Sequence, residues 1–361
     1  MTFTFGGMHV FRLLICVAIV LSLGIASARA QAPATTQSAG QKTVRLLSIG
    51  NSFSSDATDY LPGITAAGGH KFVFGHARIG GSPLERHAKA ITAFETNPED
   101  PAGQPYRVTL PGGGFANVSL KALLIEQPWE YVTIQQGSWL SHKPETYQPY
   151  ADQIVAYVRQ HAPQAKILIH ETWAYRADEE IFTKDNFTPD EMYARLHKGY
   201  QGLAKSVGAT MIIPVGTAFQ NTREDSRWVE EIAKVNLADY VRPKLPPDDR
   251  SMYKSWLWTR RQGVTQIYPD CRHASKYGKF LGAAVWYETL FGEDVRQNTY
   301  VPRDMDPADA RLLRDIAHKT VTEKLIPTAA TMDFSPKEPL PVVPPTPAAP
   351  ATAPALPVSA H

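Results

Sequence analysis

The chain has 361 residues, of which 43% are hydrophobic and 20% are charged, and its formal net charge is +2. This is the composition of a globular protein, and the near-neutral charge gives no electrostatic basis for nucleic-acid binding. The length allows one large domain or two small ones.

The first 30 residues have the pattern of a secretory signal peptide. Arg12 precedes the apolar run LLICVAIVLSLGIA, and Ala28 and Ala30 form an A-x-A cleavage site. We therefore expect cleavage near Ala30 and a secreted or periplasmic protein with no stable membrane span after cleavage. The alternative is an uncleaved N-terminal anchor, although the apolar run is shorter than the about 20 residues of a membrane span.

Cysteine content agrees with this interpretation. The only cysteines are Cys16, within the expected signal, and Cys271. The mature chain would keep one thiol, which excludes an internal disulfide and a cysteine-based metal site. Residues 31–42 are rich in Ala, Gln, Thr and Ser, and we predict a disordered linker there.

Short β-branched apolar runs alternate with helical patterns over residues 43–326, which we expect to form one domain. The predicted strands are 44–49, 71–75, 131–135, 166–170 and 210–214. The predicted helices are 56–67, 83–95, 146–161, 189–207, 274–291 and 307–325. Runs that are apolar on both faces and alternate with helices indicate a parallel sheet. Ligands of such sheets bind beyond the carboxyl ends of the strands.

Three segments fall outside this alternation. Residues 103–120, within an insertion near 97–120, hold PGGGF between two short runs and predict a hairpin. Residues 221–266 read as a long irregular insertion rich in Arg, Pro and Trp. Residues 336–361 are rich in Pro and Ala and predict a disordered tail that is a candidate tether to the cell surface.

Polar clusters follow successive predicted strands. The first strand ends at GNSFS, the second leads into ARIGGSPLERH, the third ends at QQGSW and the fourth at HETW. A later segment, YPDCRH, precedes a predicted helix. Because parallel strands end at one edge of the sheet, these clusters are expected to meet there.

Ser52 and the pair Asp270 and His273 are candidates for acyl-transfer chemistry. A carboxylate three residues before an imidazole can orient it, so that its free nitrogen faces a nucleophile. Ser52, this pair, the Gly81 amide and a glutamine side chain would supply a nucleophile, a base and oxyanion donors. The simpler interpretations are a turn at Ser52 and a helix cap at Asp270.

These segments resemble the blocks of SGNH (GDSL-type) hydrolases. GNSFS resembles the first block, with Ser52 in the place of the catalytic serine, and ARIGGS the second, with Gly81 in the place of the oxyanion-hole glycine. DCRH resembles the last block, Asp-x-x-His. The order of the blocks fits residues 44–291. LLSIGNSFSSDATDYLP, IQQGSW and HETW are closer to a less characterised SGNH-like branch, of the domain-of-unknown-function type.

The resemblance implies a flavodoxin-like three-layer α/β/α sandwich with a central five-stranded parallel sheet, and ester hydrolysis, often of acetyl groups on carbohydrates. The amide of Ser52 is expected to join that of Gly81 in the oxyanion hole. The family's third block is Gly-x-Asn-Asp, whose Asn donates to the oxyanion, but QQGSWLS stands here without an Asn. Gln135 or Gln136 would have to take that place, and the sequence does not choose between them.

Several other residues are candidates for contact with a substrate, and packing or a place on the solvated surface is the alternative role for each of them. His170, Glu171 and Trp173 end the fourth strand and either contact substrate or pack the rim, and Trp139 is a candidate for stacking on a sugar ring. HETW is not a zinc motif, because no second His follows at helical spacing. Arg78 and Arg86 either meet an anionic substrate or are solvated surface.

We therefore predict an exported serine esterase that removes a small acyl group, acetyl above all, from a small-molecule or polysaccharide ester. Ser52, His273 and Asp270 would act without a metal or cofactor, and no nucleic-acid partner is expected. The alternative is a non-catalytic glycan-binding or cell-surface scaffold module on the same fold. A phosphoesterase or sulfatase is disfavoured, because the sequence lacks the metal cluster or nucleophilic cysteine that such enzymes use.

Overall fold

The computed structural model describes residues 40–323, except 224, 233, 248 and 262. The expected signal peptide and the tail at 336–361 lie outside the described residues, as does the expected linker up to residue 39. None of the helices among the described residues has the length and apolarity needed to cross a membrane.

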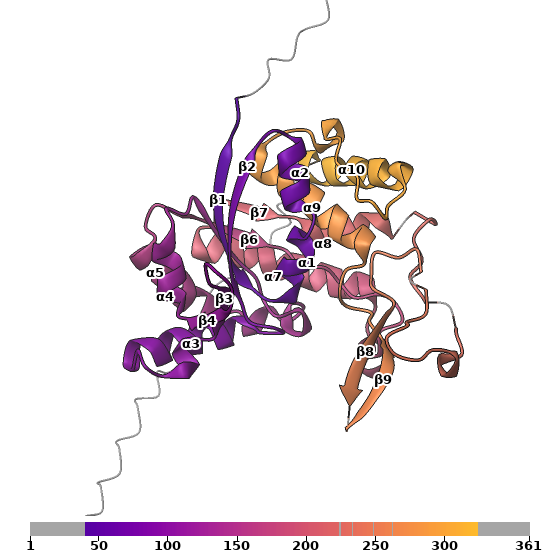
Figure 1. Cartoon of the computed structure of the whole chain (residues 1–361), viewed down its shortest axis with the longest axis horizontal. Helices are drawn as coiled ribbons and strands as arrows, with labels where there is room; N and C mark the ends of the chain where they lie inside the picture. The colour runs from indigo at the N-terminus through magenta and orange to yellow at the C-terminus, as the bar shows by residue number, and fades with distance from the viewer. Residues whose placement is uncertain (1–39, 224, 233, 248, 262, 324–361) are drawn as a thin grey trace, which may run out of the picture. The chain divides into compact units, whose positions relative to one another are not determined.

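Five parallel strands form the central sheet, in the order β2-β1-β5-β6-β7 (Figure 1). They are β1 (Thr43–Gly50), β2 (Lys71–Arg78), β5 (Tyr131–Ile134), β6 (Lys166–His170) and β7 (Met211–Ile213). All five predicted strands are confirmed. β2 is longer than expected because it pairs with β1 along its whole length, up to the pair Gly50 and Arg78.

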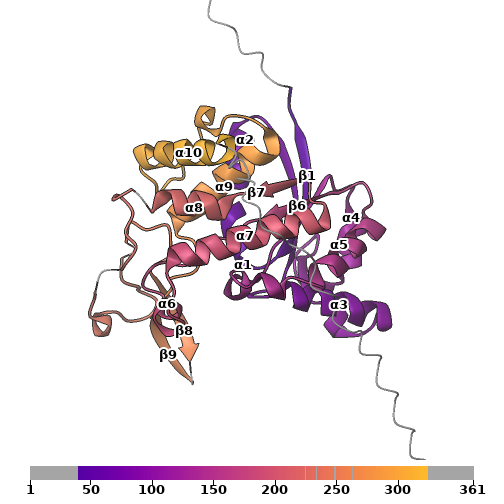
Figure 2. The ribbon, with the colours of Figure 1, turned by 180° about the vertical axis from the view of Figure 1, so that it is seen from behind.

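Helices cover both faces of the sheet, as expected for a three-layer α/β/α sandwich (Figures 1 and 2). One face carries α3 (Leu84–Thr96), α5 (Tyr150–His161) and α7 (Pro189–Val207), with α4 (Leu120–Glu126) beside α5. The other carries α1 (Ser52–Thr58), α2 (Leu61–Ala67) and α9 (Lys276–Phe291), with α8 (Val215–Thr222) and α10 (Pro307–Thr322) packed on α9. The short α6 (Glu180–Lys184) precedes α7.

The strand order places the switch of chain direction at β1, which lies between β2 and β5. The chain leaves β1 through helices on one face and leaves β2 through a helix on the other, which opens a crevice at the carboxyl end of β1. Leu46, Leu47 and Ile49 of β1 are fully buried, since both faces of the sheet are covered. The residues that follow β1 therefore start from a rigid position.

Two predicted helix starts are wrong. The helix expected from residue 56 begins at Ser52 and is broken near Asp59 into α1 and α2, because Asn51 caps α1 and Pro62 opens the first turn of α2. The helix expected from residue 146 begins at Tyr150, because the carbonyl of Thr146 accepts a hydrogen bond from Gln136 Nε2. The predicted start of α7 at Thr188 is confirmed by a capping box with Glu191.

The hairpin expected within 103–120 is present as β3 (Tyr106–Thr109) and β4 (Phe115–Val118). The segment 221–266 is more regular than expected, because it contributes the strand β8 (Trp256–Arg261), which pairs with β9 (Val264–Pro269). This two-stranded ribbon projects from the body at the lower right of Figure 1. Its aromatic and β-branched residues on either side of Gly263 favour a hairpin. Because Trp256 pairs with Pro269, the ribbon fixes the chain immediately before Asp270.

Candidate active site

The structure brings Ser52, His273 and Asp270 together from distant parts of the chain. Ser52 is the first residue of α1, directly beyond β1. Its Oγ lies 2.9 Å from His273 Nε2. His273 Nδ1 lies 3.0 Å from Asp270 Oδ2 and 3.2 Å from Oδ1. This chain of contacts is the geometry by which a carboxylate orients an imidazole and the imidazole accepts the proton of a serine.

The turn that carries Ser52 is held by its neighbours. The Asn51 side chain caps α1, since its Oδ1 accepts a hydrogen bond from the Phe53 N–H over 3.0 Å. A Cβ atom at Gly50 would lie 2.7 Å from Ser54 Oγ and 3.0 Å from the Gln135 side chain, so only glycine fits there. Ser54 Oγ lies 2.9 Å from Nε2 of the half-buried His76, so this second serine helps to hold the turn in place.

The loop that carries His273 is fixed from several sides. Asp270 Oδ1 accepts the N–H of His273 over 3.1 Å as well as contacting its ring. The Lys254 N–H donates to the His273 carbonyl over 2.8 Å. The Asp56 carboxylate accepts the Ala274 N–H over 3.1 Å, which ties α1 to the loop. The base and the nucleophile are therefore positioned by the same helix.

Electrostatics set the protonation states of this pair. The hydrogen bond that the His273 ring donates to the Asp270 carboxylate raises the pKa of His273 above its ordinary value of 6.5, although burial acts in the other direction. Burial alone would raise the pKa of Asp270, but its hydrogen bonds with the His273 ring and with backbone N–H groups hold that pKa below the usual range. Asp270 is thus a carboxylate that stabilises a protonated His273.

Two backbone amides are available to an oxyanion near Ser52. Within the described residues, the N–H groups of Ser52 and Gly81 have no hydrogen-bond partner. Gly81 has φ of +63°, a left-handed conformation that favours glycine. Asn51 links the two amides, because its Nδ2 donates to the carbonyl of Ser82 over 3.0 Å. The expected placement of Ser52 and Gly81 is compatible with this geometry.

The expectation for the two glutamines is corrected. Gln136 is fully buried, accepts the N–H groups of Leu84 and Gly137 at 2.9 Å, and donates to Thr146. Gln135 Nε2 donates to Asn51 Oδ1 over 2.9 Å, and its Oε1 lies 2.6 Å from His170 Nδ1. Both amides are committed to buried partners, so neither is free to donate to an oxyanion.

The HETW segment packs behind the site. His170, Glu171 and Trp173 are each at most 1% exposed, which corrects the idea that they contact substrate. Burial lowers the pKa of His170 to about 3, so its ring is neutral and its Nδ1–H donates to Gln135. Glu171 binds His197 Nδ1 at 2.7 Å and the hydroxyl of Thr217 at 2.9 Å.

Trp173 supports the loop of the base. Its ring stacks between Phe53 at 4.3 Å and Phe219 at 4.5 Å, and its Nε1 donates to the Arg272 carbonyl over 2.8 Å. Trp139 behaves differently, because it is 48% exposed and its Nε1 donates to the Gly81 carbonyl over 3.3 Å. Trp139 alone of the four candidates remains placed to contact a substrate.

Arg176 is a structural residue of the site that sequence reasoning missed. Its buried side chain pairs with Asp178 at 2.7 Å, and its Nη1 donates to the Lys254 carbonyl over 3.3 Å. Its Nη2 lies 3.4 Å from Cys271 Sγ. A buried arginine carries no local sequence signal. Burial raises the pKa of the Cys271 thiol to about 12, so this cysteine is not a nucleophile at neutral pH.

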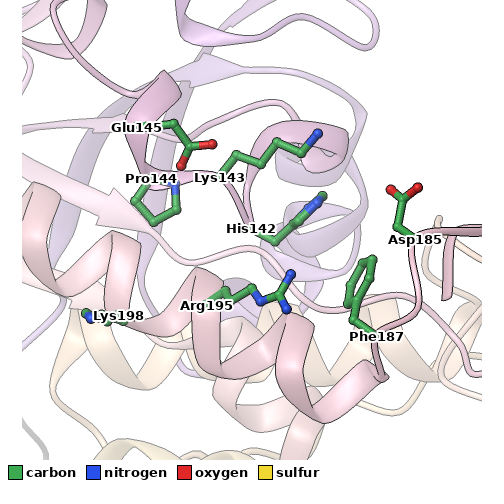
Figure 3. A pocket seen from close by; sticks show the side chains of 8 residues that line it. All are labelled: His142, Lys143, Pro144, Glu145, Asp185, Phe187, Arg195 and Lys198. Atoms are coloured by element: carbon green, nitrogen blue, oxygen red, sulfur yellow. The ribbon is translucent and has the colours of Figure 1, made fainter.

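A pocket of about 470 Å³ opens at Ser52 and His273. A pocket of about 540 Å³ lies elsewhere, between α7 and the loop at His142 (Figure 3). There Phe187 stacks on His142 at 5.4 Å, and the Arg195 guanidinium lies over the Phe187 ring at 4.9 Å. The lining of the larger pocket holds no serine or cysteine beside a histidine, so the smaller pocket is the candidate active site.

One group of side chains in the described part has the spacing of a metal site, namely Glu288, Asp294 and His318. The protein itself satisfies these ligands. His318 Nδ1 lies 2.8 Å from Glu288 Oε1, Glu288 Oε2 accepts the Val295 N–H, and Asp294 pairs with Arg296. We interpret the group as a polar link between α9 and α10.

Comparison with known proteins places the chain in a family. The sequence pattern of a family described as Domain of unknown function (DUF4886) matches residues 45–236, which include Ser52 and Gly81 but end before Asp270. No curated protein matches the chain.

Solved structures that are similar to the chain include a member of this family. The crystal structure of a DUF4886 family protein from Bacteroides uniformis is 26% identical, with a TM-score of 0.58, over 78% of this chain and 95% of that one. A candidate SGNH hydrolase from Slackia heliotrinireducens has 21% identity and a TM-score of 0.40, over 69% and 99% of the two chains. A candidate GDSL-like lipase from Parabacteroides merdae has 15% identity and a TM-score of 0.39, over 70% and 98%. The last two scores are too low to inform on activity.

Proposed function

The chain belongs to the DUF4886 family, and for this member we propose a serine esterase that hydrolyses a small acyl ester, acetyl above all, on a carbohydrate. The observation that carries the proposal is the continuous set of contacts from Ser52 Oγ through His273 to Asp270. The pocket at Ser52 gives this nucleophile access to a ligand.

In the proposed mechanism, His273 Nε2 accepts the proton of Ser52 as Oγ attacks the acyl carbon. The resulting oxyanion is bound by the N–H groups of Ser52 and Gly81. His273 then gives its proton to the leaving alcohol, and an acyl-serine remains. A water molecule then attacks the acyl carbon as it gives a proton to His273. The bond to Ser52 Oγ breaks, the carboxylic acid leaves, and His273 returns the proton to Oγ.

The proposal extends to location and substrate. The signal-peptide pattern supports action outside the cytoplasm, with the tail at 336–361 as a candidate tether. The exposed ring of Trp139 beside Gly81 supports a substrate with an apolar ring face, as sugars have.

The test is covalent labelling of the purified protein with a fluorophosphonate, followed by mass spectrometry of the adduct. We expect an adduct on Ser52 that is lost in Ser52→Ala, together with turnover of p-nitrophenyl acetate. Ser55→Ala is the matched control in the same turn, since Ser55 Oγ makes only a 3.4 Å contact to the Asn51 carbonyl. Absence of both the adduct and turnover, with retained glycan binding, would favour the non-catalytic module instead.

A further inference from the structure

The pocket at Ser52 is rich in positive charge. Four basic side chains line it, alongside the carboxylates of two acidic residues: Arg78, Lys254, Lys276 and Lys279, with Asp56 and Asp270. The protein as a whole has a net charge of only +2, so this excess is local. A concentration of one sign of charge in a pocket attracts ligands of the opposite sign.

Two of the four cations are neutralised within the protein. Lys279 Nζ lies 3.0 Å from Asp59 Oδ2 and 3.8 Å from Asp56 Oδ1. Lys276 Nζ contacts the backbone carbonyl of Asp304 and lies 4.0 Å from its carboxylate. Asp270 is committed to His273. Both carboxylates of the pocket lining, Asp56 and Asp270, are therefore already paired with other side chains of the protein.

Arg78 and Lys254 are the other two cations, and in the described part of the chain neither side chain has an ion pair or hydrogen bond. Arg78 ends β2 and pairs in register with Gly50, two residues before Ser52. Lys254 is held by its backbone, since its N–H donates to His273 and its carbonyl accepts from Arg176. Both backbones are therefore fixed beside the triad while both charged groups stay free.

We propose that Arg78 and Lys254 bind an anionic group, such as a carboxylate, sulfate or phosphate, on the alcohol part of the ester, so that the enzyme selects acidic substrates. This inference rests on the proposed esterase function. We place the negative charge on the alcohol part of the ester because an acetyl group has no ionisable group. The chemistry fits an acetylated acidic sugar, whose anion accepts hydrogen bonds from a guanidinium and an ammonium.

The experiment compares two aryl acetates that differ in charge, 4-acetoxybenzoate and 4-acetoxybenzamide, as substrates of the mature protein. We expect kcat/KM to favour the anionic ester on the order of tenfold, the usual scale of a charge-assisted contact. Arg78→Gln and Lys254→Gln should each reduce this ratio several-fold, and the double variant should abolish it. Raised ionic strength should also reduce it. Arg86→Gln is the control and should leave the ratio unchanged, because Arg86 is exposed and lines a different pocket.

A binding arm separates this inference from the esterase proposal. In Ser52→Ala protein, 4-hydroxybenzoate should bind more tightly than 4-hydroxybenzamide. Arg78→Gln should reduce the difference, and Arg78→Gln together with Lys254→Gln should remove it. Ser52-dependent turnover of both esters at equal kcat/KM would overturn the anion site and leave the esterase intact. If neither ester is turned over and Ser52 is not labelled, the esterase proposal fails. The binding arm then decides: charge-dependent binding supports the anion site, and equal binding overturns it.

Discussion

The Asn51 side-chain amide donates a hydrogen bond to the backbone carbonyl of Ser82 over 3.0 Å, and this contact joins the nucleophile turn to the loop that carries Gly81. The other end of the same side chain caps α1 at Phe53 and accepts Nε2–H from Gln135. One buried residue thus fixes the relative position of the two amides that would form the oxyanion hole.

Asn51→Ala tests this relationship. Loss of the cap should destabilise the fold by about 1 kcal/mol, and loss of the link to Ser82 should lower kcat by about 100-fold, the scale of one oxyanion donor. KM should change little, because Asn51 is buried behind the turn. Steady-state kinetics and thermal unfolding measure the two effects, with Ser55→Ala as the control. A kcat that falls only in proportion to the unfolded fraction would contradict a positioning role.

Asp270→Asn tests the orientation of the base. The side chain keeps its size but loses the charge that raises the pKa of His273. We expect kcat to fall by about 10³- to 10⁴-fold. Because only neutral His273 accepts a proton, the wild-type rate should rise with pH through a pKa above 6.5, and this limb should move to lower pH in the variant. The pH profile of kcat/KM checks this, with Asp315→Asn, an exposed carboxylate on α10, as the control. An unmoved limb would show that Asp270 does not control this titration.

Trp173→Phe separates support of the loop from contact with substrate. Phenylalanine can still stack between Phe53 and Phe219, but it cannot donate to the Arg272 carbonyl. We expect a stability loss of about 1–3 kcal/mol and a several-fold lower kcat at unchanged KM. A raised KM at constant kcat would instead restore the substrate contact that the sequence analysis considered.

Trp139→Ala tests the exposed ring at Gly81. We expect KM for acetylated sugars to rise several-fold, with little change for p-nitrophenyl acetate, since a small aryl ester does not need the ring. Trp139→Phe keeps an aromatic face but loses the hydrogen bond to Gly81. If the Phe variant behaves like wild type, stacking explains the effect. If both variants lose activity on both substrates, Trp139 positions Gly81 and does not bind sugar.

Local sequence signals determined the architecture and the triad. Apolar β-branched runs and capped helices, such as Thr188 with Glu191, depend on short-range backbone and burial physics, which a pattern reports directly. Ser52 was found because it follows a predicted strand, and the strands of a parallel sheet end at one edge. Asp270 and His273 were found from their Asp-x-x-His spacing before a predicted helix, which resembles the last block of the SGNH hydrolases. Their 2.9 to 3.2 Å contacts agree with that placement.

Only the tertiary structure decided what the other polar side chains do. The sequence does not indicate whether a polar or aromatic side chain contacts a ligand or packs behind the turn, because its hydrogen-bond partners are distant in sequence. This applies to Gln135, Gln136, His170 and Trp173. The sequence could not show that Asn51 takes the amide of Gln135, or that the ammonium groups of Lys276 and Lys279 are occupied while Arg78 and Lys254 are free. A hydrogen bond or ion pair depends on the positions of two groups in space. The role of a polar side chain can therefore be assigned only when the positions of its distant partners are known.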